Sequence, residues 1–134
     1  YRMEKESVTI VAPAYNEEEN IGLFIDHCLA YIQHDPTITL LIVNDGSTDA
    51  TLSNIQKYAD TIQIVTYEKN KGYKEALTEG VRQANSHWII TIDSDLQYKL
   101  TELSDFLSFF YCYYFFYHYF CLAYLRLYFL NRLF

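Results

Sequence analysis

Four short apolar runs alternate along the chain with segments whose apolar residues recur at helical spacing. The runs cover residues 8–12, 40–43, 62–67 and 88–92. The first is nearly all apolar, as in a strand that is covered on both faces. Strands that alternate with helices of about 10–15 residues favour βαβ units and a parallel sheet. We therefore expect an α/β domain with an open parallel sheet, in the element order βαβαβαβ.

The segments between the runs each show one apolar face. In the first segment Asn16 stands where a helix N-cap is expected, and Glu19 follows three residues later as in a capping box. The apolar residues that follow predict a helix: Ile21, Phe24, Ile25, Cys28, Leu29 and Ile32. The same periodicity predicts helices over residues 52–59 and 76–84.

Two carboxylates, Asp93 and Asp95, directly follow the fourth apolar run. In an open parallel sheet, ligands collect at the carboxyl ends of the strands. Two anionic groups with little positive charge nearby in sequence suit a hard divalent cation. The alternative is a solvated turn, in which Asp and Ser are common.

The loops at 13–17, 45–49 and 93–97 leave the carboxyl ends of three predicted strands, so we expect them to meet at one edge of the sheet. The chain lacks a Gly-rich dinucleotide loop and a Gly-x-x-x-x-Gly-Lys-Ser/Thr motif. A phosphate bound at this edge would therefore need a metal ion or a helix N-terminus. The net charge of −7 argues against a nucleic-acid surface, which needs a basic patch.

Four motifs in this order resemble family 2 glycosyltransferases. They are Ala-Pro-Ala-Tyr-Asn-Glu-Glu at 12–18, Val-Asn-Asp-Gly-Ser-Thr-Asp at 43–49, Asn-Lys-Gly at 70–72 with Ala76, and Asp-Ser-Asp-Leu-Gln at 93–97. The last motif is most similar to the polyprenyl- and dolichol-phosphate sugar synthases. The resemblance covers about residues 7–105.

The resemblance implies the nucleotide-sugar-binding half of a Rossmann-like GT-A fold. It implies that Pro13, Tyr15 and Glu17 hold the base and ribose and that Asp45 contacts the base. Asp93 and Ser94 would complete the nucleotide-sugar site. Mg²⁺ or Mn²⁺ would be gathered around the diphosphate by Asp93, Asp95 and Gln97.

The implied activity is the metal-dependent transfer of a sugar from a nucleoside diphosphate sugar to a polyprenyl phosphate or to another glycan or lipid acceptor. Family members continue for roughly as many residues again, so we expect a donor-binding half with weak activity, and no catalytic residue is assigned. The chain departs from the family at Asn44, where an acidic residue is usual, and at 98–100, which replace a Pro-rich segment. Two alternatives are a non-catalytic nucleotide-sugar-binding or membrane-associated module and a haloacid dehalogenase-type phosphotransferase. In the latter the Asp-x-Asp pair belongs after the first strand.

Residues 106–134 differ in composition from residues 1–105, and we treat the two as separate regions. Residues 106–125 carry no formal charge. A segment of this length can span a bilayer, but its many tyrosines prefer the membrane interface. The tail is expected to be an apolar, aromatic helix lying in the membrane plane, or else not to be native coding sequence. Three cysteines without paired spacing favour a reducing compartment. We expect a cytoplasmic protein, peripheral to or anchored at the cytoplasmic face of the membrane.

Overall fold

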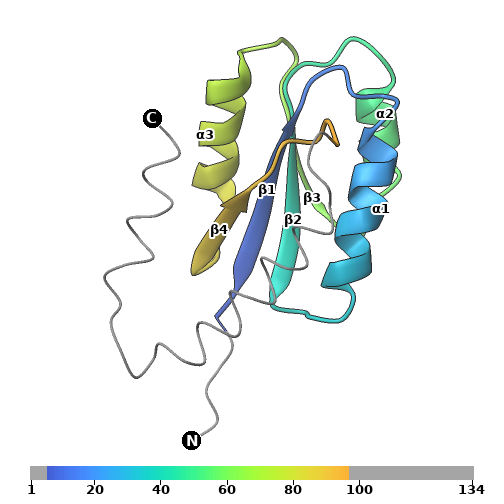
Figure 1. Ribbon diagram of the computed structural model, residues 1–134. Coiled ribbons are helices and arrows are strands. Elements are labelled where there is room, and N and C mark those ends of the chain that lie inside the picture. The colour runs from blue at the N-terminus through green and yellow to red at the C-terminus, as the bar shows by residue number, and fades with distance from the viewer. Residues whose placement is uncertain (1–5, 97–134) are drawn as a thin grey trace, which may run out of the picture. The chain divides into compact units, whose positions relative to one another are not determined.

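The computed structural model describes residues 6–96, which form an open sheet with helices on both faces (Figure 1). The sheet has four parallel strands in the order β3-β2-β1-β4. The strands are β1 Val8–Ala14, β2 Ile38–Asn44, β3 Gln63–Thr66 and β4 Trp88–Thr91, and the helices are α1 Ile21–Ile32, α2 Thr51–Gln56 and α3 Tyr73–Gln83. The predicted alternation and the predicted parallel sheet are confirmed.

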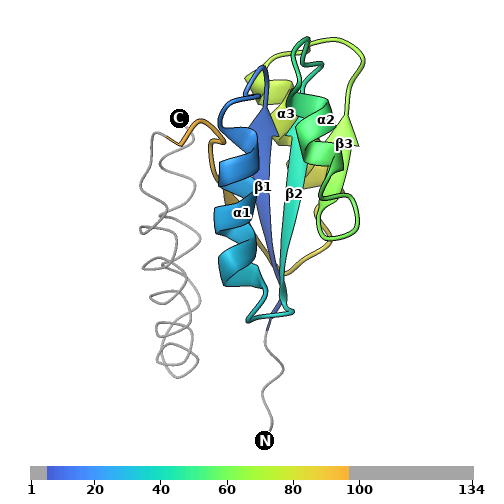
Figure 2. The same cartoon turned by 90° about the vertical axis from the view of Figure 1, so that its right-hand side faces the viewer.

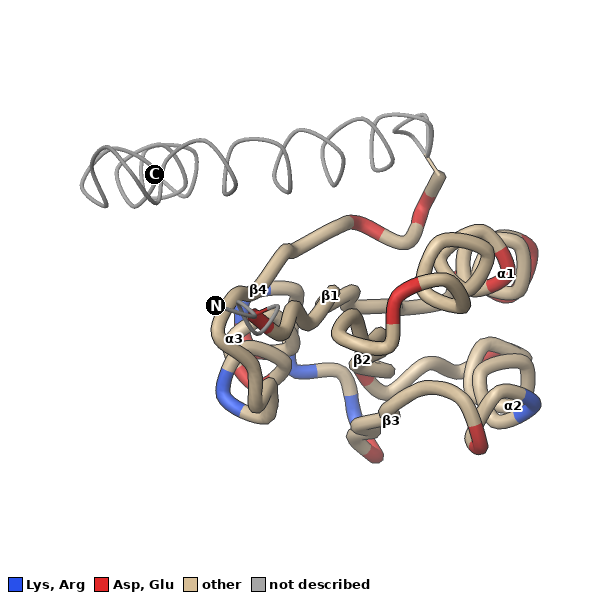
Figure 3. The backbone as a smooth tube through the Cα atoms, turned by 90° about the horizontal axis from the view of Figure 1, so that it is seen from below, with Lys and Arg blue, Asp and Glu red and all other residues tan. Residues whose placement is uncertain are grey.

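Helices α1 and α2 cover one face of the sheet and α3 covers the other (Figures 2 and 3). Strand residues point alternately to the two faces, and both faces are covered, which is why the central strands are mostly apolar. On the α3 face, Leu41 and Val43 form a buried cluster with Ala76. Gly80 brings α3 close to this face, because a Cβ at this position would lie 2.3 Å from Val11 Cγ1.

Pro13 lies inside the first strand, although the apolar run that predicts this strand ends at residue 12. β1 continues to Ala14, which pairs with Asn44 of β2. Successive residues of a strand between two neighbours bond alternately to either side. Ala14 O accepts a hydrogen bond from Asp45 N on the β2 side at 2.9 Å. Pro13 therefore faces the β4 side, where pairing has ended at Val11, so its missing N–H leaves no ladder bond unmade.

The predicted N-cap at Asn16 is wrong. α1 begins at Ile21, after Asn20, and has no side-chain cap. Asn16 has a positive φ of 54°, a conformation that Asn tolerates better than most residues. Its side chain accepts a hydrogen bond from Thr48 N at 2.8 Å. The side chain of Asn16 does accept a backbone N–H, as a capping residue would, but the N–H belongs to the neighbouring loop and not to the helix.

Some of the sequence predictions fall outside the described residues. Gln97 and the aromatic tail at 106–134 are among them. Within residues 6–96, no helix is long and apolar enough to cross a membrane.

Candidate functional site

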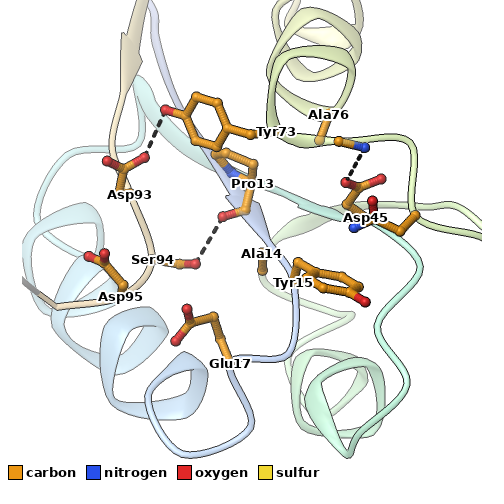
Figure 4. A pocket seen from close by; sticks show the side chains of 12 residues that line it. Pro13, Ala14, Tyr15, Glu17, Asp45, Tyr73, Ala76, Asp93, Ser94 and Asp95 are labelled. Carbon is orange, nitrogen blue, oxygen red and sulfur yellow. Dashed lines mark hydrogen bonds between the residues drawn. The ribbon is translucent and has the colours of Figure 1, made fainter.

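A pocket of about 510 Å³ opens at the carboxyl edge of the sheet (Figure 4). This size is typical of small-molecule sites. The end of β1, the first turn of α3 and the loops after all four strands line it. The lining residues are Pro13, Ala14, Tyr15, Glu17, Asp45, Asn70, Gly72, Tyr73, Ala76, Asp93, Ser94 and Asp95. The predicted meeting of the loops after β1, β2 and β4 is confirmed.

Hydrogen bonds join the loop after β1 to the loop after β2. Asn16 N donates to Ser47 Oγ at 3.1 Å, and Glu17 N donates to Thr51 Oγ1 at 2.8 Å. Glu17 itself accepts a bond from Asn20 Nδ2 through Oε2. The backbone that carries the pocket residues Tyr15 and Glu17 is therefore held by α2 as well as by α1.

Asp49 also links these two loops. Its Oδ1 accepts bonds from Thr51 N at 2.9 Å and from Thr51 Oγ1 at 2.5 Å, and its Oδ2 accepts one from Glu18 N at 3.2 Å. Desolvation alone would raise the pKa of Asp49. The hydrogen bonds from Thr51 and Glu18 outweigh it and hold the pKa below its ordinary value.

Asp45 clamps the loop after β3 to the end of β2. Its carboxylate is 2% exposed and accepts bonds from Lys71 N at 2.8 Å and from Gly72 N at 2.9 Å. Beside it, Gly46 has a φ of +65°, and a Cβ there would lie 2.3 Å from Asn70 N. The family resemblance implied that Asp45 contacts the base. The structure shows that it positions the pocket wall at 70–72.

The loop after β4 is anchored on both sides of Asp93. Ile92 N donates to Val11 O at 3.0 Å, and the buried Ser94 Oγ donates to Pro13 O at 2.9 Å. The hydroxyl of Ser94, predicted to contact the nucleotide sugar, is thus bonded to the β1 backbone. Tyr73 Oη donates to Asp93 Oδ1 at 2.8 Å across the pocket (Figure 4).

The described pocket wall is acidic. Its lining contains four carboxylates, those of Glu17, Asp45, Asp93 and Asp95, and no lysine or arginine. Lys71 does not line the pocket. Its Nζ lies 3.7 Å from the centroid of the Tyr67 ring. An anion entering this pocket therefore meets negative charge from the described residues.

This donor set fits a divalent cation that arrives with a phosphate ligand. Mg²⁺ is commonly held by one or two carboxylates together with substrate phosphates, and Asp93 and Asp95 supply two carboxylates in the pocket wall. Within residues 6–96, no cluster of three or more His, Cys, Asp or Glu side chains forms a complete metal site. The carboxylates of residues 6–96 therefore fit a cation that is bound partly by the protein and partly by a phosphate, better than a cation bound by protein ligands alone.

Asn44 stands where the family usually has an acidic residue, and it lies at the end of β2. Its Nδ2 donates to Thr66 Oγ1 at 2.9 Å. Its Oδ1 is buried without a hydrogen-bond partner among the described residues. The neutral amide avoids a second buried carboxylate beside Asp45, at the cost of one unsatisfied acceptor.

Sequence reasoning missed the contribution of the loop after β3 to the pocket. Asn70, Gly72 and Tyr73 line the pocket, whereas the sequence analysis named 70–72 only as a motif and assigned no site residue there. The signal was available, because a parallel sheet brings the end of the third strand to the same edge as the other three.

The sequence pattern of glycosyl transferase family 2 matches residues 9–113. The chain is also similar to a dodecaprenyl-phosphate galacturonate synthase from Rhizobium johnstonii, with 35% identity over 95 residues. That match covers 67% of this chain and 28% of the relative. The chain therefore spans less than a third of that relative's length.

Solved glycosyltransferase structures share the fold. Residues 1–349 of S. aureus TarS in complex with UDP-GlcNAc match with a TM-score of 0.64 and 27% identity, over 77% of this chain and 30% of that chain. Glucosyl-3-phosphoglycerate synthase from Mycobacterium tuberculosis, in complex with Mn²⁺, UDP and glucosyl-3-phosphoglycerate, matches with a TM-score of 0.56 and 26% identity, over 66% of this chain and 33% of that chain. The four-stranded parallel sheet, the loops at its carboxyl edge and the match over residues 9–113 agree. The chain belongs to glycosyl transferase family 2.

Proposed function

We propose that this chain binds a nucleoside diphosphate sugar together with Mg²⁺ or Mn²⁺, as the donor-binding part of a glycosyltransferase. The observation that carries the proposal is the acidic pocket, with four carboxylates and no lysine or arginine in its described wall. A cation between the two would offset the repulsion between this wall and a diphosphate. The complexes of the M. tuberculosis synthase with Mn²⁺ and UDP, and of TarS with UDP-GlcNAc, support this ligand class.

The residues around the pocket fall into two groups with different proposed roles (Figure 4). Tyr15 and Asp45 lie on one side, and we assign them the nucleobase together with Pro13. Tyr15 is 45% exposed, and its ring offers a flat apolar surface on which a base can stack. Each oxygen of Asp45 already accepts one backbone bond but keeps a second lone pair for a base N–H.

Carboxylates dominate the other side of the pocket, where we place the ribose and the diphosphate. Glu17 offers acceptor oxygens to ribose hydroxyls, and Ser94 fixes the backbone between the two aspartates. Asp93 and Asp95, with Gln97 beyond the described residues, would hold the cation. The cation would stabilise the charge that develops on the diphosphate leaving group as the sugar departs.

For the acceptor we propose a polyprenyl phosphate. The support is the similarity to a dodecaprenyl-phosphate galacturonate synthase. A lipid phosphate is already anionic, so this acceptor does not require the general base that a hydroxyl acceptor needs. A lipid acceptor would also agree with a location at the cytoplasmic face of a membrane, which we propose for this protein.

The test is calorimetric titration of UDP- and GDP-sugars into the full chain, with and without MgCl₂ or MnCl₂. We expect Asp95→Asn to weaken binding about tenfold or more when metal is present, because it removes one anionic ligand. Binding without metal should change little. Equal affinities of the wild type and Asp95→Asn under every condition would contradict the metal assignment.

A transfer assay distinguishes the enzyme from a non-catalytic binding module. Radiolabelled sugar and polyprenyl phosphate are supplied to chain that has been shown to bind the donor. Metal-dependent labelling of the lipid supports the enzyme, and donor binding without labelling supports the module. The haloacid dehalogenase alternative is excluded by the family match and by the position of Asp93 after β4, the fourth strand in sequence.

A further inference from the structure

Tyr73 occupies a place that neither helix formation nor core packing explains. It is the first residue of α3, and its side chain is 57% exposed. Instead of projecting into solvent, the phenol reaches the loop after β4 and donates to Asp93 Oδ1 at 2.8 Å. The contact joins two elements of the pocket wall that are 20 residues apart in sequence.

The backbone on both sides of this contact is already fixed. The main chain at Asp93 is held by Ile92 N to Val11 O and by Ser94 Oγ to Pro13 O. At the other end, Asp45 holds the N–H groups of Lys71 and Gly72, and α3 begins at the next residue. The remaining freedom lies in the Asp93 side chain, and the hydrogen bond from Tyr73 restricts it.

We propose that Tyr73 is a positioning residue for the Asp93 carboxylate in cation binding. This inference rests on the proposed function and deepens it. The phenol O–H takes one lone pair of Oδ1, which leaves Oδ2 and the other Oδ1 lone pair to a cation. Carboxylates that ligate metals are generally oriented by such hydrogen bonds, and losing one costs about 10–100-fold in metal affinity.

The exposure of Tyr73 separates this role from a structural one. A hydrogen bond between exposed side chains contributes little to stability, because water replaces either partner. Removing the hydroxyl should therefore leave folding almost unchanged and act on the cation. If the residue served only the fold, removing its hydroxyl would lower the stability and leave the cation affinity unchanged.

The experiment compares the full wild-type chain with Tyr73→Phe and with the control Tyr58→Phe. Tyr58 Oη also donates to an aspartate, Asp26 Oδ1, at 2.8 Å, but neither residue lines the pocket. UDP and GDP are titrated calorimetrically with and without MnCl₂. Bound Mn²⁺ is measured independently by electron paramagnetic resonance.

We expect Tyr73→Phe to reduce the gain in nucleotide affinity that Mn²⁺ provides, and the Mn²⁺ affinity itself, by about tenfold. Nucleotide affinity without metal and the thermal midpoint should stay at wild-type values, and Tyr58→Phe should behave as wild type. In an Asp93→Asn background, Tyr73→Phe should cause no further loss, because the two side chains act through one contact.

The wild-type chain alone tests the proposed function, and the variant tests the inference. A wild type that gains no nucleotide affinity from Mn²⁺ would overturn both. A wild type with the gain and a Tyr73→Phe variant with the same gain would overturn the inference alone. A parallel loss of metal-free affinity and thermal stability in Tyr73→Phe would also overturn it, since the residue would then be structural.

Discussion

Gly80 lies on the face of α3 that packs against the sheet, and its lack of a side chain sets the distance between the two layers. A Cβ at this position would lie 2.3 Å from Val11 Cγ1 and 3.0 Å from Val43 Cγ2. Glycine inside a helix costs about 1 kcal/mol relative to alanine. Close packing of α3 on the central strands is the physical reason for glycine here.

We expect Gly80→Ala to lower the free energy of unfolding by about 1–2 kcal/mol. The added methyl overpacks the interface by about 1–3 kcal/mol, and the higher helix propensity of alanine offsets part of this. Urea unfolding followed by circular dichroism measures the change. The control is Gly22→Ala on α1, where a Cβ would meet only Tyr58 Oη at 3.9 Å. This control should be neutral or slightly stabilising, and a stabilised Gly80→Ala variant would contradict the packing argument.

The loops at the carboxyl edge hold one another through side chains that bond to backbone. Asn16 and Asp49 connect the loops after β1 and β2, and Asp45 connects the end of β2 to the loop after β3. Backbone groups in irregular segments need such partners when they are removed from water. The same bonds that satisfy these groups also fix the shape of the pocket wall.

We expect Asp45→Asn to destabilise the fold by about 2 kcal/mol, within the range for hydrogen bonds to a charged acceptor. An asparagine amide has one acceptor oxygen and would turn an NH₂ group toward one of the two N–H donors. Amide hydrogen exchange should accelerate at Lys71 and Gly72, as measured by NMR, and nucleotide affinity should fall as the wall at 70–72 loosens. The exposed Asp60→Asn provides the control and should change none of these. Unchanged exchange at Lys71 and Gly72 in Asp45→Asn would show that the clamp is dispensable.

Across the whole chain, the aromatic residues and the charges are unevenly divided. The acidic pocket residues lie within 6–96, whereas residues 106–125 carry no formal charge and are rich in Tyr and Phe. An apolar segment of this kind needs cover from a membrane, a partner or an aggregate. Membrane contact would agree with the lipid acceptor that we propose.

We expect a chain shortened to residues 1–105 to be more soluble than the full chain, and the full chain to sediment with lipid vesicles. The reason is that tyrosine side chains prefer the membrane interface, and the shortened chain lacks the uncharged segment that is rich in them. Sedimentation with vesicles and thermal unfolding are measured on both chains. If the full chain is monomeric in detergent-free buffer and ignores vesicles, the membrane proposal is wrong.

The sequence by itself determined the strands, the parallel sheet and the edge at which the site forms. These features depend on local patterns: the apolar runs that become β1 to β4, and the polar residues that follow each run. A parallel sheet then brings all strand ends together, so the placement of Tyr15, Asp45 and Asp93 around one pocket followed from chain order alone. The family resemblance added their roles, which remain proposals.

Only the tertiary structure decided how the polar side chains of the site are used. Asn16 has the chemistry of a helix cap but bonds to Thr48, 32 residues away. Asp45 holds a loop 26 and 27 residues away, and Tyr73 donates a hydrogen bond to Asp93 across the pocket. A carboxylate or an amide accepts whichever N–H or O–H the fold brings to it, and a local pattern does not contain that partner. The packing of the loops on the sheet therefore determines which donor each of these side chains bonds.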